Sequence, residues 1–75
     1  MTKREIKQEL NHRLGIDAVD VMLFKGRYFA IEPTPITEGY WVHEIFFKCL
    51  SLDYRVLIEV DTLEGAKNYI NELVC

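Results

Sequence analysis

Residues 19–31 read VDVMLFKGRYFAI. On both sides of the central Lys25-Gly26 pair the side chains alternate between two faces with a period of two, as in β-strands. The glycine accepts the positive φ that a tight turn between antiparallel strands requires. We therefore predict a β-hairpin over residues 19–31.

Two more strands are predicted after the hairpin. Residues 32–39 contain both prolines and predict an extended surface loop, because proline cannot donate a hydrogen bond to a strand ladder. Residues 40–50 are rich in aromatic and β-branched side chains and predict a long strand. Residues 51–53 predict a turn into an alternating fourth strand over residues 54–60.

Each end of the chain predicts a helix. Thr2 and Glu5 form a capping box, and Gly15 is placed for a left-handed C-cap, so a helix is expected over residues 3–14. The last segment is helical as well, with either Asp61 or Thr62 as its N-cap. Apolar side chains recur at helical spacing along both segments: Ile6, Leu10 and Leu14 in the first, and Leu63, Ala66, Ile70, Leu73 and Val74 in the second.

The element order is therefore α-β-β-β-β-α within one domain, residues 1–75. Since each helix has a single apolar face, we predict an α+β fold, a four-stranded antiparallel meander with two helices packed on one face.

Both faces of this sheet are apolar. The face assigned to the helices carries Val19, Val21, Leu23, Tyr28, Ala30, Trp41, Ile45, Phe47, Val56, Ile58 and Val60. The second face carries Met22, Phe24, Phe29, Ile31, Tyr40, Val42, Phe46 and Leu57, interrupted by Arg27, Glu44, Lys48, Arg55 and Glu59. Monomers seldom leave a large apolar patch bare.

Three interpretations of the second face remain open. It is a homodimer interface, it is a docking surface for another protein, or the assignment slips at a bulge or one helix covers this face. If the face is open, the expected anchors are Phe24, Phe29, Phe46 and Leu57. The expected rim that orients the partner is Arg27, Lys48, Arg55 and Glu59.

Composition excludes several classes of protein. Of the 75 residues, 49% are hydrophobic and 28% are charged, which is typical of a globular domain rather than a disordered chain. The apolar runs are too short for a membrane span, no secretory signal is recognisable, and two cysteines are too few for a disulfide scaffold. We therefore expect a small cytoplasmic protein without membrane contact.

Residues that could carry chemistry are sparse. No spacing of cysteine and histidine predicts a metal site, and no glycine-rich phosphate loop is present. His43 alternates with Trp41 and Ile45 and is interpreted as a partly buried structural histidine with a satisfied hydrogen bond. We predict that the chain is not an enzyme and holds no cofactor.

A nucleic-acid-binding function is the alternative. The order of elements, with Glu64-Gly65-Ala66-Lys67-Asn68 opening the last helix, resembles the double-stranded RNA-binding domain, in which lysines at that place hold phosphates. Only Lys67 matches, Asp61 and Glu64 flank it, and the chain predicts one strand more. The net charge of −3 also opposes binding to a phosphate backbone, so we do not expect nucleic acid as the partner.

The function predicted from the sequence is a non-enzymatic protein-binding module. It would self-associate or dock on a larger host protein through the second sheet face. Small acidic domains of this size include phage and mobile-element accessory proteins, among them inhibitors of host enzymes that handle nucleic acids. This last hypothesis rests on an analogy of size and charge alone.

Overall fold

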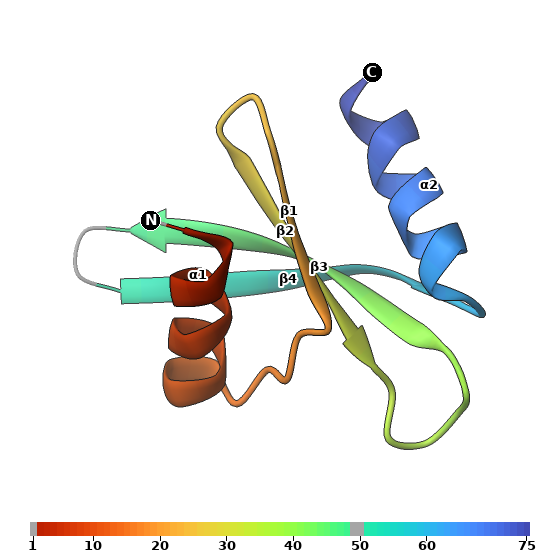
Figure 1. Ribbon diagram of the computed structural model, residues 1–75, viewed down its shortest axis with the longest axis horizontal. Coiled ribbons are helices and arrows are strands. Elements are labelled where there is room, and N and C mark those ends of the chain that lie inside the picture. Colours follow the sequence, from red (N-terminus) through yellow and green to blue (C-terminus); the bar gives the residue numbers. More distant parts are fainter. Residues whose placement is uncertain (1, 49–50) are drawn as a thin grey trace.

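The computed structural model describes residues 2–48 and 51–75, so Cys49 lies outside the described residues. Its elements are α1 (Lys3–Glu9), the π-helix η1 (Leu10–Leu14), β1 (Asp20–Phe24), β2 (Arg27–Pro33), β3 (Tyr40–Lys48), β4 (Ser51–Val60) and α2 (Leu63–Val74). The four strands form one antiparallel sheet in the order β1-β2-β3-β4. The predicted α+β fold with a meander between two terminal helices is confirmed (Figure 1).

The strands differ from the prediction mainly at their ends. The hairpin turn is confirmed, with Lys25 at φ 48° and Gly26 at φ 81°. β3 ends at Lys48 and β4 begins at Ser51, which pairs with Lys48. The turn predicted at residues 51–53 is therefore wrong, because Ser51 and Leu52 continue the alternation of β4 and pair with β3.

Both predicted helix caps are present. The Thr2 hydroxyl accepts the Glu5 amide at 3.2 Å, and the Glu5 carboxylate accepts the Thr2 amide at 3.3 Å. The first helix widens into η1 and ends at Gly15, whose φ of 68° is the predicted left-handed cap. At the second helix, the Thr62 hydroxyl accepts the Gly65 amide at 2.9 Å, so Thr62 rather than Asp61 is the N-cap.

The two helices pack on opposite faces of the sheet, so the prediction that they share one face is wrong. The cluster under α1 and η1 contains Ile6, Leu10, Ile16, Val21, Ala30 and Ile45. The cluster under α2 contains Phe29, Ile31, Val42, Ala66 and Ile70. Ala30 and Phe29 are neighbours on β2, and neighbours on a strand point to opposite faces. Because both faces are apolar, each needs a helix to shield it from water.

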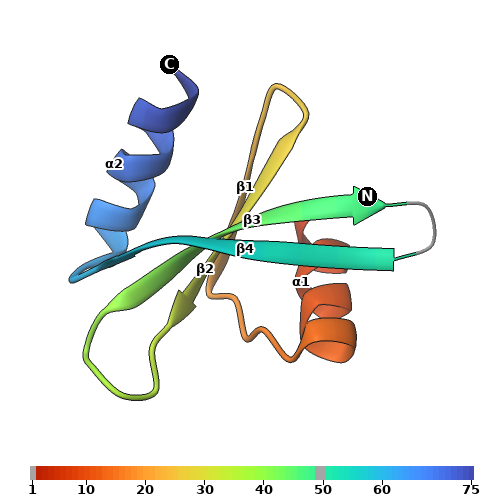
Figure 2. The ribbon, with the colours of Figure 1, turned by 180° about the vertical axis from the view of Figure 1, so that it is seen from behind.

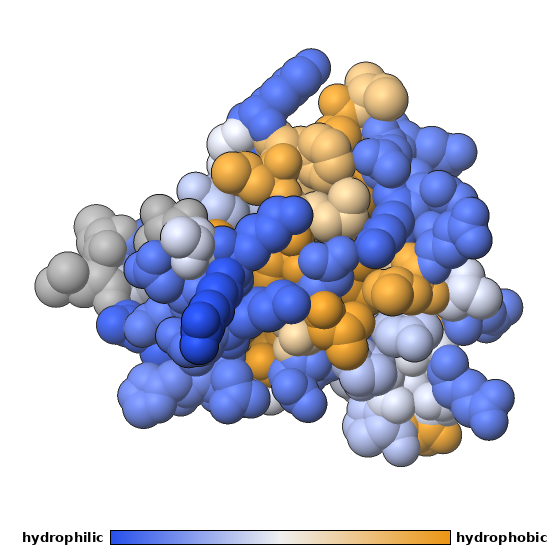
Figure 3. Space-filling model, in the orientation of Figure 1, coloured by the Kyte–Doolittle hydropathy of each residue, from blue (hydrophilic) through white to orange (hydrophobic). Residues whose placement is uncertain are grey.

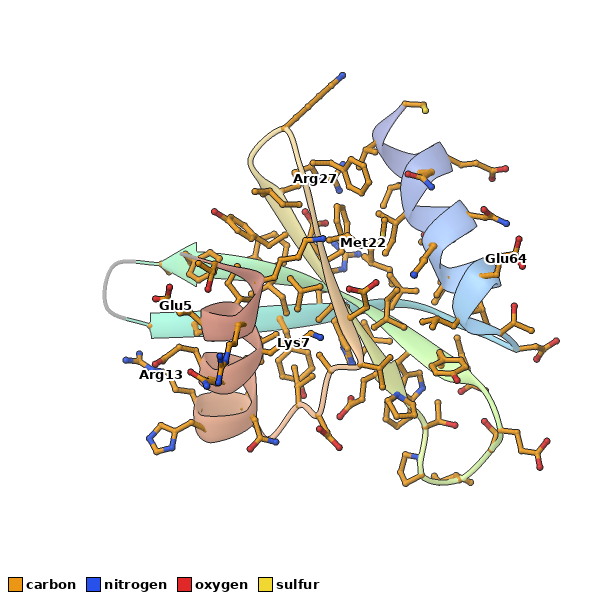
Figure 4. All side chains as sticks on the ribbon, viewed as in Figure 1. Glu5, Lys7, Arg13, Met22, Arg27 and Glu64 are labelled. Carbon is orange, nitrogen blue, oxygen red and sulfur yellow. The ribbon has the colours of Figure 1, made fainter. Side chains whose placement is uncertain are left out.

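The figures show this arrangement. α1 lies in front of the β3–β4 hairpin in Figure 1 and behind it in Figure 2, whereas α2 lies at the other end of the twisted sheet in both views. Lys7 of α1 donates to the Val19 carbonyl at 3.1 Å and ties the helix to the chain entering β1. Met22, by contrast, extends from β1 toward α2 and packs against its cluster (Figure 4).

A β-bulge reverses part of the face assignment on β4. Val42 lies opposite Ile58, but the next residue of β3, His43, lies opposite Val56, so Leu57 is an extra residue. Beyond such a bulge every side chain changes face. Ile58 and Val60 therefore belong to the α2 face, and Glu59 belongs to the α1 face, contrary to the prediction. Neither helix of the described residues is long and apolar enough to cross a membrane.

Candidate functional site

β4 is the most exposed strand of the sheet. It is an outer strand of 10 residues, and none of them is buried. Its apolar side chains Tyr54, Val56 and Ile58 are 42%, 48% and 37% exposed. A long apolar outer strand is a template for pairing with another chain, and proteins usually shorten, charge or cover such strands. β1, the other outer strand, is only 5 residues long and includes the buried Val21.

The backbone of β4 offers free hydrogen-bonding groups on its outer side. In an antiparallel pair, residues that bond to the partner alternate with residues that face away from it. The Tyr54 amide donates to Oδ1 of its neighbour Asp53 at 2.8 Å, which places Tyr54 among the outward residues. Leu52 and Val56 lie two positions to either side and share this orientation. We call these three residues, with their outward N–H and C=O groups, the β4 edge.

Two residues of the predicted rim meet around Glu44 on the α2 face. The Arg27 guanidinium donates from Nε and Nη2 to the two carboxylate oxygens of Glu44, both at 2.9 Å. These hydrogen bonds lower the pKa of Glu44 below its ordinary value, although partial burial acts in the opposite direction. Arg55 stands opposite Glu44 on β4 and contributes a further attraction that lowers this pKa.

Three of the four predicted anchors are not available as an open surface. Phe29 is 0% exposed, in the centre of the cluster under α2. Phe24 and Leu57 pack against the same cluster. An open apolar face is therefore excluded for these residues, and the third interpretation of the second face is confirmed, because α2 covers this face with Ala66 and Ile70 and a bulge shifts part of β4.

The remaining predicted residues have separate surroundings. Phe46 is 36% exposed and lies opposite Asp53. Lys48 is exposed, with Nζ 3.7 Å from Oδ2 of Asp53. Glu59 leaves the group, because the bulge turns it to the α1 face, where its carboxylate accepts the Trp41 indole N–H at 3.1 Å. We call the charged residues that surround Phe46 on the α2 face the charged patch: Arg27, Glu44, Lys48, Asp53 and Arg55.

A hollow of about 590 Å³ lies at the end of β2, beside the charged patch. Arg27, Tyr28 and Glu44 line it together with Phe46 and Phe47. Phe47 packs edge-on against Tyr28, with 4.8 Å between the ring centroids, yet remains 44% exposed. The hollow thus combines aromatic side chains with the paired charges of Arg27 and Glu44.

The other face carries different apolar surface. In Figure 3, which views the α1 side, the helix itself is mostly hydrophilic, and apolar atoms gather between the two helices over the β1–β2 hairpin. Leu23, on the outer side of β1, is half exposed in this hairpin. Because β1 is short, we do not place the candidate site there.

His43 is buried more completely than predicted, and the predicted hydrogen bond is present at one of its two ring nitrogens. Its Nε2 lies 3.0 Å from Oε1 of Glu32, whose other oxygen accepts the Asp17 amide at 3.0 Å. The His43 Nδ1 is buried without a hydrogen-bond partner among the described residues. Edge-on packing of Tyr54 against His43 encloses the pair further. Through these contacts His43 links β2, β3 and β4.

A second cavity, of about 250 Å³, opens between the end of η1 and β4. Leu14 and Ile16 line one side, and Tyr54 and Val56 line the other. The apolar surface on the α1 side of β4 is therefore continuous from the β4 edge into this cavity. Among residues 2–48 and 51–75, no group of three or more His, Cys, Asp or Glu side chains is placed to hold a metal ion.

The β4 edge was not predicted from the sequence. Tyr54 was assigned to no site and Val56 to the face under a helix, because alternation identifies the faces of a sheet and not its edges. The signal was present, since the last strand of a meander is always an outer strand, and here it alternates apolar and charged residues.

Lys67, which carries the resemblance to the double-stranded RNA-binding domain, faces the sheet side of α2. Its Nζ lies 3.4 Å from Oδ2 of Asp20 on β1, and that acid reduces its positive field. The β4 edge and the charged patch are thus the surfaces from which a function has to be argued. No protein family, curated protein or solved structure matches this chain.

Proposed function

We propose that this chain is a non-enzymatic protein-binding module that docks through the β4 edge by strand addition. The observation that carries the proposal is the 10-residue outer strand without a buried residue, in which the apolar side chains Tyr54, Val56 and Ile58 are exposed. Strand addition obtains affinity from main-chain hydrogen bonds and specificity from alternate side chains. The outward N–H and C=O groups of Leu52, Tyr54 and Val56 supply the main-chain hydrogen bonds. The exposed side chains of the strand supply the specificity.

The charged patch supports the same role by orienting the partner. Charged groups at the border of an interface mainly increase association rates and specificity. Lys48 and Arg55 are exposed there, and Phe46 offers an apolar contact between them. Partners of this surface are a second copy of the chain or a larger protein, including a host enzyme that the module would inhibit in the cytoplasm.

The test is a proline at an outward position of β4. Val56→Pro removes an N–H that does not bond to β3, so the sheet should keep its fold, as is usual for proline in outer strands. Leu23→Pro is the matched control, because Leu23 is an outward residue of β1 with nearly the same exposure, 49% against 48%. We expect Val56→Pro to lose association and Leu23→Pro to retain it.

Association is measured as solution mass and as protection of the β4 amides from hydrogen exchange, with and without cell extract. Circular dichroism checks that both variants are folded. If Val56→Pro and Leu23→Pro keep the same mass, protection and bound proteins as the natural sequence, the β4 edge is not the docking surface.

A further inference from the structure

The inference concerns the partner of the β4 edge and rests on the function proposed above. Ser51, Asp53 and Arg55 pair with β3 through Lys48, Phe46 and Glu44, respectively. Their side chains lie on the α2 face, whereas those of Leu52, Tyr54 and Val56 lie on the α1 face. The strand before the bulge is therefore regular, with an acid and a base on either side of Tyr54 on one face.

This arrangement of charges is self-complementary. In an antiparallel pair with a two-fold axis normal to the sheet, directly opposite side chains share a face. With the axis at Tyr54, Asp53 lies opposite Arg55 of the second copy, and Arg55 lies opposite Asp53 of the second copy. The same alignment places Leu52 opposite Val56 of the second copy, and Val56 opposite Leu52 of the second copy. Every opposite pair from Leu52 to Val56 is then either oppositely charged or apolar.

Neighbouring alignments lack this complementarity. An axis at Asp53 places two aspartates directly opposite each other, and an axis at Arg55 places two arginines opposite each other. An axis at Val56 runs into the bulge at Leu57, which interrupts regular pairing. Like charges directly opposite each other destabilise a strand pair. Of these alignments, the one centred on Tyr54 pairs opposite charges and stays clear of the bulge.

We infer that two copies of the chain pair through β4, antiparallel and centred on Tyr54, and form one continuous eight-stranded sheet. The Tyr54 amide exchanges its bond to Asp53 for a carbonyl of the second copy, which frees the Asp53 carboxylate for Arg55 of that copy. On the α1 face, the side chains of the second copy extend toward the cavity of about 250 Å³ beside Tyr54 and Val56. Because the ladder is short, the dimer should dissociate on dilution.

The test reverses each charge in turn. Asp53→Arg gives a chain with two arginines around Tyr54, and Arg55→Asp gives a chain with two aspartates. Each variant alone should dimerise roughly tenfold or more weakly than the natural sequence. An equimolar mixture should recover the dimer, because each copy then meets the opposite charge in the other. A fold defect in either variant cannot produce this recovery.

Solution mass is measured by light scattering over about a hundredfold range of concentration. The natural sequence should approach twice the 8.8 kDa of one chain, and the mixture should do the same while each variant alone stays near 8.8 kDa. Circular dichroism verifies the fold of both variants. A mixture that remains as light as its components overturns the alignment.

The proposed function and this inference fail in different ways. A natural sequence that is monomeric at every concentration, but whose β4 amides are protected by another protein, overturns the dimer and leaves the docking function intact. Unchanged association of Val56→Pro overturns both.

Discussion

At the scale of single residues, the Arg27–Glu44 pair makes the stability of the fold depend on pH. Arg27 lowers the pKa of Glu44, so the folded protein favours the ionised carboxylate. A lowered pKa means that the stabilisation is present above the ordinary value of about 4.3 and is lost as the pH falls through the lower value of the folded state. Glu44→Gln should therefore reduce stability at neutral pH and flatten its decrease in acid.

The measurement is urea denaturation of Glu44→Gln and the natural sequence at a series of pH values between about 7 and 3. Glu72→Gln is the control, because Glu72 is exposed on α2. Identical pH profiles for Glu44→Gln and the natural sequence would show that the pair does not couple protonation to folding.

The His43–Glu32 pair shows which part of a side-chain contact can be predicted from the local sequence pattern. The position of His43 between Trp41 and Ile45 was sufficient to predict a buried histidine. Its partner Glu32 was not predicted, because the two prolines after it suggested a loop, whereas β2 continues to Pro33. A side-chain pair that joins strands depends on their alignment, which the sequence of one strand does not contain.

At the scale of elements, the β1–β2 turn depends on its glycine. Gly26 has φ 81°, and a Cβ atom added there would meet nothing within 4 Å. Gly26→Ala should therefore lose about 1 kcal/mol through backbone conformation alone. At Lys25, which has φ 48°, Lys25→Asn should be neutral or slightly stabilising, since asparagine tolerates this region better.

Both turn variants are compared by urea denaturation, monitored by circular dichroism. Lys25→Asn serves as the matched control, since it changes the neighbouring turn residue without forcing a new strain. Equal stability of Gly26→Ala and the natural sequence would contradict the role assigned to the turn.

The elements themselves were mostly predictable, because capping boxes, turns and alternation are local. A bulge was one of the open alternatives, but its position was not predicted, although Val56, Leu57 and Ile58 interrupt the alternation with three consecutive apolar residues. This run lets both Leu57 and Ile58 belong to the α2 face, where Leu57 packs against the cluster under the helix. Because of this bulge, Glu59 lies on the α1 face and not in the predicted site.

At the scale of the whole molecule, the sequence indicated two apolar faces and two amphipathic helices but not which helix covers which face. The face that each helix covers depends on the paths that residues 15–19 and 61–62 take around the sheet. The hydrophobic periodicity of the sequence does not specify these paths. The observation that had suggested an open docking face has the simpler explanation of one helix on each face. The surface left for a partner is consequently an edge of the sheet.

Because one sheet separates the two clusters, neither can form without the other. Phe29 and Ala30 are adjacent on β2 and belong to different clusters, so the loss of either helix also exposes the strands that support the other. Ile70→Ala should lower the free energy of unfolding by about 2–5 kcal/mol, a large part of the stability of so small a domain.

Trp41, the single tryptophan, lies on the α1 face, where it packs edge-on against the buried His43, and so reports on this face of the sheet. If the molecule unfolds as one unit, Ile70→Ala should shift the urea transition of Trp41 fluorescence as far as that of circular dichroism. Leu73→Ala, at an exposed position of α2, should leave both transitions nearly in place. A fluorescence transition unmoved by Ile70→Ala would mean that α1 and its face fold on their own. Strands β2 and β3 contribute residues to both clusters. We therefore expect the fluorescence and circular dichroism transitions to move together.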